Sequence, residues 1–197
     1  QNLDTKTEKT EFLRGYGIQG KGERENWQSV DTVGFGVSLK ANLATPGKWE
    51  IALGGRGESL PNYDNKITLD TENLDQWGLP IVKVDFKYRE NELAMLEHMT
   101  KASEEMLTKA GFKNVGSYRT YPDPGSAVHE MGTARMGLDP KTSVLNKYNQ
   151  MHDVKNVFIT DGSFMPSSGC QNPSLTYMAV TARACEYALK LFKSNQL

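Results

Sequence analysis

The residue with the clearest chemical potential in this sequence is a histidine in a stretch of small residues. His129 lies in "SAVHEMGTARMG", residues 126–137, where two glycines let the backbone approach a bound group closely. An imidazole can accept a proton at neutral pH, which suits acid–base chemistry. The sequence has no G-x-S-x-G nucleophile, so a serine hydrolase is not indicated. The structural alternative is a loop histidine hydrogen-bonded to a carbonyl.

A second stretch, "DGSFMPSSGCQNPSLT" at residues 161–176, contains features of a binding loop. Asp161 and Gly162 predict a turn, and Asn172 followed by Pro173 predicts the start of a helix. Backbone N–H groups and the helix dipole would then point at one loop, which favours an anion or an electron-rich ring. The alternatives are that Asp161 only forms a turn and that Asn172 only caps the helix.

Composition excludes several classes of protein. The net charge of −1 provides no basic field for nucleic acid. No apolar run approaches the roughly 18 residues of a membrane span, and the polar N-terminus is unlike a signal peptide. We therefore expect a soluble protein, cytoplasmic or periplasmic. Cys170 and Cys185 are expected to be reduced thiols, and "HEMGT" lacks the second histidine of a zinc motif, so no metal site is expected.

The stretch "GYGIQG" at residues 15–20 matches the dinucleotide fingerprint G-x-G-x-x-G. That motif requires a buried strand before it and a helix after it, because the pyrophosphate sits on the helix N-terminus. Neither flank has the necessary pattern. We predict a glycine-rich bend between short strands, with the glycines serving backbone geometry.

The first 90 residues predict an antiparallel sheet. Period-2 alternation of apolar and polar residues occurs at 33–40, 48–53 and 81–88. The segments 54–65 and 71–80 are rich in turn residues and predict loops.

Residues 91–110 predict a helix with Asn91 as its cap and Gly111 at its end. Two correctly ordered Glu–Lys pairs and a solvated His98 are expected on its polar side. The predicted apolar stripe comprises Leu93, Leu96, Met99, Ser103, Met106, Leu107 and Ala110.

The C-terminal part predicts an α/β element. The run "NVFITDG", residues 156–162, has a continuous apolar core typical of a parallel strand buried on both faces. A helix is predicted over 172–193, capped by Asn172 and with Pro173 in its first turn. Its predicted inward face comprises Leu175, Met178, Ala179, Ala182, Cys185, Leu189 and Phe192.

These stretches together resemble the C-terminal part of the glucose–methanol–choline family of FAD-dependent oxidoreductases. The resemblance rests on "VHEMGTARMG", "VFITDGSFMPSSGCQNPSLTYMA" and the final helix, in family order, and extends to "DQWGLP" and "FLRGYGIQG". It implies an α+β fold. Residues 1–122 would be a portion of the substrate-binding domain, with an antiparallel sheet and helices. Residues 123–197 would be the catalytic loop and a strand-loop-helix that completes an α/β FAD-binding domain absent from this chain.

The resemblance also implies roles for individual residues. His129 would be the active-site histidine facing the flavin, with Asn172 as its partner where other members have a second histidine. The implied FAD contacts are Asp161 and Gly162 at the pyrophosphate, and Pro173, Ser174 and Thr176 at the isoalloxazine ring.

The implied reaction is oxidation of an alcohol group, on a sugar, polyol, aldonate or choline-like substrate, to a carbonyl by hydride transfer to flavin. The implied partners are the N-terminal FAD-binding part of the same protein and a small-molecule alcohol, and the electron acceptor is not defined. The family's own G-x-G-x-x-G is not found in this sequence, so the chain alone is expected to be inactive. The alternative is a non-catalytic β-rich module that binds carbohydrate or protein.

Overall fold

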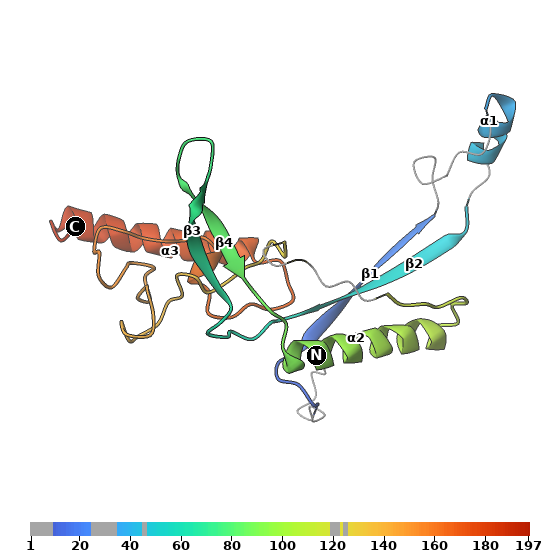
Figure 1. The fold of residues 1–197 in the computed structure, drawn as a ribbon, viewed down its shortest axis with the longest axis horizontal. Coiled ribbons are helices and arrows are strands. Elements are labelled where there is room, and N and C mark those ends of the chain that lie inside the picture. Colours follow the sequence, from blue (N-terminus) through green and yellow to red (C-terminus); the bar gives the residue numbers. More distant parts are fainter. Residues whose placement is uncertain (1–9, 25–34, 45–46, 119–122, 124–125) are drawn as a thin grey trace.

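The computed structural model describes residues 10–24, 35–44, 47–118, 123 and 126–197. The fold is α+β, with antiparallel strands and helices, as the sequence predicts (Figure 1). Its elements, in chain order, are β1 (Tyr16–Arg24), α1 (Val37–Ala44), β2 (Trp49–Gly57), β3 (Lys66–Leu74), β4 (Pro80–Asp85), α2 (Glu90–Lys109), the short 3-10 helix η1 (Gly162–Phe164) and α3 (Ser174–Lys193).

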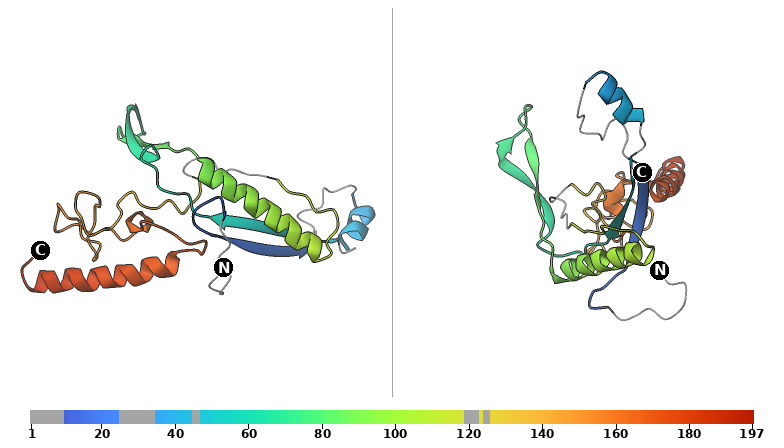
Figure 2. Two further views of the ribbon diagram at one scale, coloured as in Figure 1. Left: turned by 90° about the horizontal axis from the view of Figure 1, so that it is seen from below. Right: turned by 90° about the vertical axis from the view of Figure 1, so that its right-hand side faces the viewer.

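The strands form two separate antiparallel pairs. β1 pairs with β2 over its full length, from Tyr16 opposite Gly57 to Arg24 opposite Trp49. β3 and β4 form a hairpin that projects away from the rest of the molecule (Figure 1). Helix α2 packs along the β1–β2 ribbon, and α3 lies at the other end of the molecule (Figure 2).

Helix α2 begins one residue earlier than predicted, and its cap differs. The Glu92 carboxylate accepts a hydrogen bond from the Arg89 backbone N–H at 2.9 Å, so Arg89 is the cap residue. Asn91 is not the cap, because its side-chain oxygen accepts a hydrogen bond from Leu13 N–H at 2.7 Å instead. Gly111, just beyond the helix, has φ of +85° and ends it as predicted.

The core beside α2 depends on glycines in β2. Phe12, Met95 and Met99 are buried together. A Cβ on Gly55 would lie 2.7 Å from Met99 Sδ, and a Cβ on Gly57 would collide with Met95 Sδ. The two methionines therefore pack where β2 has no side chains.

The predicted apolar stripe of α2 is partly wrong. It omitted Met95, which is buried, and included Leu93 and Met106, which are exposed. The buried face of α2 is rotated relative to the predicted stripe because Met95 and Met99 pack against the glycines of β2. Periodicity alone does not indicate this contact.

The polar side of α2 carries the predicted ion pairs. Lys101 lies 2.8 Å from Glu97, and Lys109 lies 2.5 Å from Glu105. His98 is exposed, as predicted, but it is also paired, because the Tyr16 hydroxyl lies 2.7 Å from its Nδ1. Burial raises the pKa of Tyr16 above its usual value.

Two of the predicted strands are confirmed and one is wrong. Residues 48–53 and 81–88 overlap β2 and β4. The predicted strand at 33–40 is helix α1 from Val37 onward, while residues 33–34 lie outside the described residues. The sequence of α1 contains two leucines, two alanines and one lysine, which favour a helix, so helix propensity outweighs the alternation of Val37 and Leu39.

The loop predictions also need correction. Residues 54–57 continue β2, and residues 71–74 continue β3. The β2 glycines remain in the ladder because strand pairing uses backbone groups and needs no side chain. The same holds for "GYGIQG", which is a continuous part of β1 from Tyr16 onward rather than the predicted bend.

Gly17 in β1 has a specific neighbour. A Cβ on Gly17 would lie 2.5 Å from Sγ and 3.2 Å from Cβ of Cys170, and the φ of Gly17 is outside the left-handed region. The position needs glycine because a distant loop lies directly on the strand, not because the backbone is strained.

We predict that Gly17→Ala lowers the free energy of unfolding by about 1–3 kcal/mol, the usual cost of overpacking. Gly15→Ala is the matched control, because a Cβ at Gly15 would meet no atom within 4 Å, and it should change stability by less than about 0.5 kcal/mol. Urea unfolding measures both. In a Cys170→Ala background the cost at Gly17 should fall, and an unchanged cost would contradict the proposed contact.

Candidate functional site

The segment before α3 lacks the strand that its apolar run predicts. Residues 156–162 form no strand in the described part of the chain, and Phe158 makes only an isolated bridge to Gln150. Phe158 and Ile159 are half-buried, whereas Val157 is exposed. A strand buried on both faces needs neighbouring strands, and neither described sheet contains this segment.

A second hydrophobic core holds this region together. Ala134, Leu145 and Phe164 are buried, and α3 contributes Tyr177 and Val180. The other half-buried members are Met136, Val144, Met151, Ile159 and Met165. This core is separate from the one beside α2, so the C-terminal region is organised around its own centre.

The structure brings the two chemically interesting stretches together. The Ala134 N–H donates to the Ser163 carbonyl at 3.1 Å, and the Met136 N–H donates to the Phe164 carbonyl at 2.9 Å. The Tyr177 hydroxyl of α3 donates to Met131 Sδ at 3.7 Å. The histidine loop, the Asp-Gly turn and the start of α3 therefore form one substructure.

Two buried amides fix the loop that supports this substructure. Asn149 is fully buried, has φ of +63°, and donates from Nδ2 to the Ile159 carbonyl at 2.8 Å. Gln150 donates to the Lys155 carbonyl at 2.6 Å and accepts from Asn146 at 3.0 Å. Arg183 of α3 also reaches the Asn149 side-chain oxygen at 3.5 Å. These residues were not predicted from the sequence.

His129 lies on the exposed loop that leads into this substructure. Its neighbour Val128 has φ of +57°, a conformation that β-branched residues rarely adopt. Glu130 accepts a hydrogen bond from the Ala127 N–H at 3.0 Å, which closes the loop around the histidine. The imidazole is left accessible, and strained backbone beside such a group is typical of functional sites.

Asn172 is also exposed, and it does not cap α3. The residue preceding the helix is the buried Pro173, which makes no side-chain cap bond. The capping prediction for Asn172 is therefore wrong, because Pro173 occupies the cap position. In the part of the chain that the structure describes, no hydrogen bond joins the Asn172 and His129 side chains.

The Asp-Gly turn is tightly built. Asp161 caps η1, where its carboxylate accepts from the Ser163 N–H at 2.8 Å and from the Ser163 hydroxyl. A Cβ on Gly162 would lie 2.6 Å from the Tyr177 hydroxyl, so a larger residue there would displace the Tyr177 side chain. Burial, and secondarily the Asp161 carboxylate, raise the pKa of Tyr177 above its usual value.

The first turn of α3 is open to solvent. Ser174 and Thr176 are exposed. The first N–H groups of a helix have no intrahelical acceptor and carry the positive end of its dipole. Together with the tight Asp161–Gly162 turn, this end of α3 can accept an electron-rich group.

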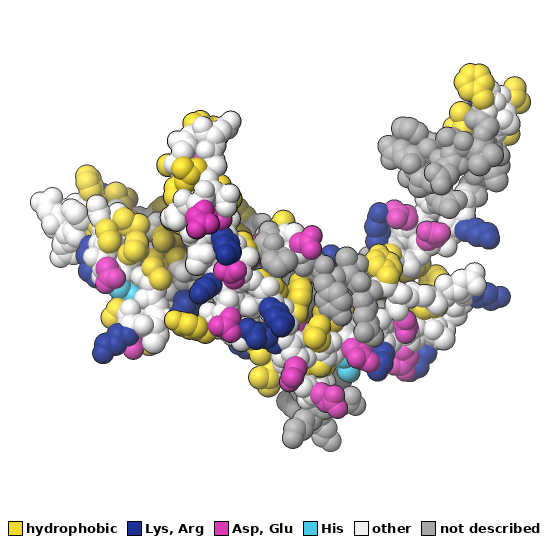
Figure 3. Space-filling model, in the orientation of Figure 1, with side chains coloured by type: hydrophobic (Ala, Val, Ile, Leu, Met, Phe, Trp, Pro, Cys, Tyr) yellow, Lys and Arg dark blue, Asp and Glu magenta, His cyan; other side chains and the backbone are white. Residues whose placement is uncertain are grey.

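The predicted inward face of α3 is wrong for this chain. Leu175, Met178, Leu189 and Phe192 are between 51% and 75% exposed. The helix instead packs Tyr177 and Val180 against the second core, buries Ala184 and half-buries Thr181. Apolar side chains consequently gather on the surface at this end of the molecule (Figure 3).

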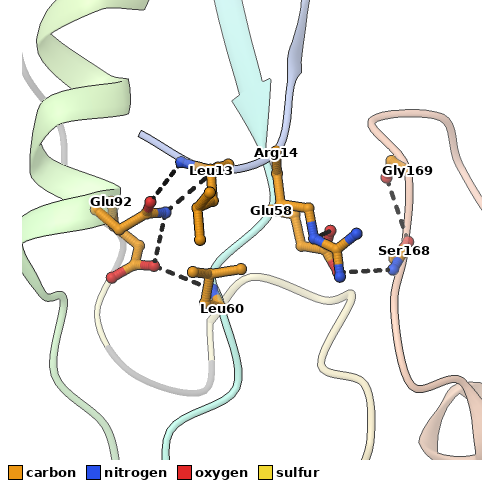
Figure 4. Close-up of polar contacts among 8 residues, drawn as sticks. Leu13, Arg14, Glu58, Leu60, Glu92, Ser168 and Gly169 are labelled. Atoms are coloured by element: carbon orange, nitrogen blue, oxygen red, sulfur yellow. Dashed lines mark hydrogen bonds and ion pairs between the residues drawn. The ribbon is translucent and has the colours of Figure 1, made fainter. Parts of the chain in front are cut away.

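One carboxylate connects the loop between η1 and α3, residues 165–173 (the site loop), to the β1–β2 ribbon. Glu58, which follows β2, accepts a hydrogen bond from the Ser168 N–H at 3.2 Å and lies 3.5 Å from Arg14 Nε (Figure 4). The sequence carries no signal for this contact, because the bonded residues are 110 positions apart.

Cys170 and Cys185 are both free thiols. Within the described residues, no three His, Cys, Asp or Glu side chains gather as a metal site would require. The described helices also include none long and apolar enough to cross a membrane.

Comparison with known proteins matches this chain to one family of oxidoreductases and to oxidases and dehydrogenases. The model of the GMC oxidoreductase family matches residues 61–181. The chain is 41% identical over 123 residues to 6'''-hydroxyparomomycin C oxidase from Streptomyces lividus, which covers 62% of this chain and 22% of that protein. It is 36% identical over 137 residues to 2-methyl-1,2-propanediol dehydrogenase from Mycolicibacterium austroafricanum, which covers 69% of this chain and 24% of that protein.

A solved structure of pyridoxine 4-oxidase from Mesorbium loti has a TM-score of 0.44 at 17% identity, covering 83% of this chain and 32% of that chain. The chain spans less than a quarter of the length of the two curated relatives named above.

We predict that Asn149→Ala lowers the free energy of unfolding by about 2–4 kcal/mol. The substitution removes a buried hydrogen bond and places alanine in a left-handed conformation. Asn156→Ala, at an exposed turn, is the control and should change stability by less than about 0.5 kcal/mol. Equal values for the two variants in urea unfolding would show that Asn149 does not hold the loop.

Proposed function

Because the chain belongs to the GMC oxidoreductase family, we propose that it forms the catalytic-residue-bearing part of an FAD-dependent enzyme that oxidises an alcohol group to a carbonyl. Its relatives are named as oxidases and dehydrogenases, which supports this class of reaction. The observation that carries the proposal is the joining of the histidine loop to the Asp-Gly turn and to α3. The substrate would be a sugar, polyol, aldonate or choline-like alcohol.

The two parts of the chain would have different roles. Residues 1–122 would belong to the substrate-binding domain, and residues 123–197 would supply the catalytic loop and the return segment of the FAD domain. The two separate hydrophobic cores support this division. The boundary would fall in the connection between α2 and the histidine loop.

The residues present fit a bound FAD. The exposed first turn of α3 leaves backbone N–H groups and the positive end of the helix dipole accessible to an electron-rich group, which is the observation that supports the fit. Asp161 and Gly162 would lie at the pyrophosphate. Pro173, Ser174 and Thr176 would lie at the isoalloxazine ring. When bound, the flavin would supply the acceptor for the substrate hydride.

His129 would act as the base for the substrate hydroxyl. Its imidazole is accessible and can take the hydroxyl proton at neutral pH as the C–H bond is broken. The exposed Asn172 amide would donate a hydrogen bond to the substrate oxygen and fix its orientation. The positive end of the α3 dipole would stabilise negative charge that develops beside it.

The partner of this chain would be the N-terminal FAD-binding part of the same protein. The chain spans about a fifth to a quarter of its relatives, and the apolar side of α3 is exposed. Large exposed apolar patches usually mark interfaces. The FAD-binding part would cover Leu175, Met178, Leu189 and Phe192 and would contribute the nucleotide-binding fingerprint.

We predict that the isolated chain is colourless and binds FAD too weakly to measure at micromolar concentration. Most of the contacts to a dinucleotide should come from the glycine-rich fingerprint, which this sequence does not supply. Titration with FAD followed by flavin fluorescence tests this. Saturable micromolar binding would place the cofactor site within the chain itself.

In the full-length flavoprotein, His129→Ala should slow anaerobic flavin reduction by substrate by roughly 10²- to 10⁴-fold, the range for a positioned base. The loss should appear in the rate of reduction rather than in substrate affinity, because a base acts chiefly in the transition state.

His98→Ala is the control, because His98 lies on the polar side of α2 and contacts Tyr16 rather than the site. It should reduce its flavin at close to the wild-type rate. Asn172→Ala should be milder than His129→Ala and should also weaken substrate binding. If His129→Ala retains FAD and the wild-type rate, the histidine is structural and the proposed mechanism is wrong.

A further inference from the structure

The loop that carries Asn172 is seated on the β1–β2 ribbon by Glu58. One Glu58 oxygen accepts from the Ser168 N–H at 3.2 Å, and the other faces Arg14 Nε at 3.5 Å (Figure 4). The Glu58 side chain is only 16% exposed, whereas Arg14 is 53% exposed. Because the Glu58 acceptor is largely shielded from water while the ion pair is half-exposed on its Arg14 side, the Ser168 hydrogen bond is the stronger of the two contacts.

Arg14 provides a local reason for the carboxylate to stay in place. Its φ of +73° is a left-handed conformation that is unfavourable for a residue with a side chain. Its guanidinium lies 3.5 Å from Glu58, where it offsets part of the negative charge. The Glu58 carboxylate therefore contacts Arg14, just before β1, through one oxygen and the Ser168 N–H of the site loop through the other.

A second contact fixes the same loop two residues later. Cys170 lies against Gly17 of β1, where no Cβ could fit. Asn172 follows two residues after Cys170, within about 14 Å of chain from Ser168. The two contacts together seat the segment that leads to Asn172, so loss of the Ser168 hydrogen bond would loosen that segment. Misplacement of a substrate-binding group by about 1 Å can cost as much as 10²-fold in rate.

We propose that Glu58 is a positioning residue, which sets the place of Asn172 by holding the Ser168 backbone against the β1–β2 ribbon. This proposal rests on the proposed function of Asn172. Glu58 itself touches neither substrate nor flavin. Its effect should depend on the reach and acceptor capacity of the side chain more than on its charge.

The full-length flavoprotein allows a test with three substitutions. Glu58→Ala removes the acceptor, Glu58→Asp keeps the charge but shortens the reach, and Glu58→Gln keeps the reach and an acceptor oxygen. Glu50→Ala, at an exposed position of β2, is the matched control. Hydrogen exchange of the Ser168 amide reports the contact directly, and anaerobic flavin reduction reports its catalytic effect.

Glu58→Ala and Glu58→Asp should speed exchange at Ser168 by about tenfold or more and slow flavin reduction by about 10- to 100-fold at full FAD content. Substrate affinity should change less than the rate of reduction. Glu58→Gln should restore both readouts to near wild type, and Glu50→Ala should alter neither. If Glu58→Ala fails to fold, Glu58→Asp carries the test.

Unchanged exchange at Ser168 in Glu58→Ala and Glu58→Asp would show that Glu58 does not hold the Ser168 amide. Faster exchange with an unchanged rate of flavin reduction in the same two variants would overturn the positioning role. Failure of the proposed function is distinguishable from both. If the wild-type protein oxidises no alcohol, the catalytic half of the proposal falls with it, while the exchange rates still decide whether Glu58 seats the loop.

Discussion

The absence of side chains at a few positions of the β1–β2 ribbon is the constraint on which the contacts of the ribbon with α2 and with the site loop depend. Gly55 and Gly57 admit the methionines of α2 to one core, and Gly17 admits Cys170 from the site loop. Interiors pack closely, so a methyl group at any of these positions would displace its neighbour. A ribbon that can bind its helix and a loop from the far end of the sequence thus connects the two halves of the chain.

Much of the local structure could be predicted from the sequence. The period of 3.6 residues located α2 and α3 to within two residues, and period-2 alternation located β2 and β4. The failures have a common cause. Periodicity indicates which residues are apolar but not what covers them. It therefore did not predict that Met95 would pack against the glycines of β2. Nor did it predict that α3 would bury Ala184 and expose its larger apolar side chains.

The sequence named candidate site residues, whose roles stay predictions, but not the residues that support them. His129, Asn172 and Asp161 were named because they lie in two short motifs, and the resemblance implied their roles. Glu58 and Tyr177 were not, because their roles come from contacts with residues distant in the sequence. A motif is a local feature that the sequence displays directly. The residues that hold a loop in place depend on tertiary contacts, which the sequence does not display.

A crystal structure of the full-length protein with FAD and an unreactive alcohol analogue would be the most direct test of the proposed mechanism. We expect the imidazole of His129 and the amide of Asn172 both to lie within hydrogen-bond distance of the analogue's oxygen, with the start of α3 beside the flavin ring. We also expect the FAD-binding part to cover the apolar side of α3. An analogue bound away from His129, or an α3 still exposed to solvent, would contradict the mechanism.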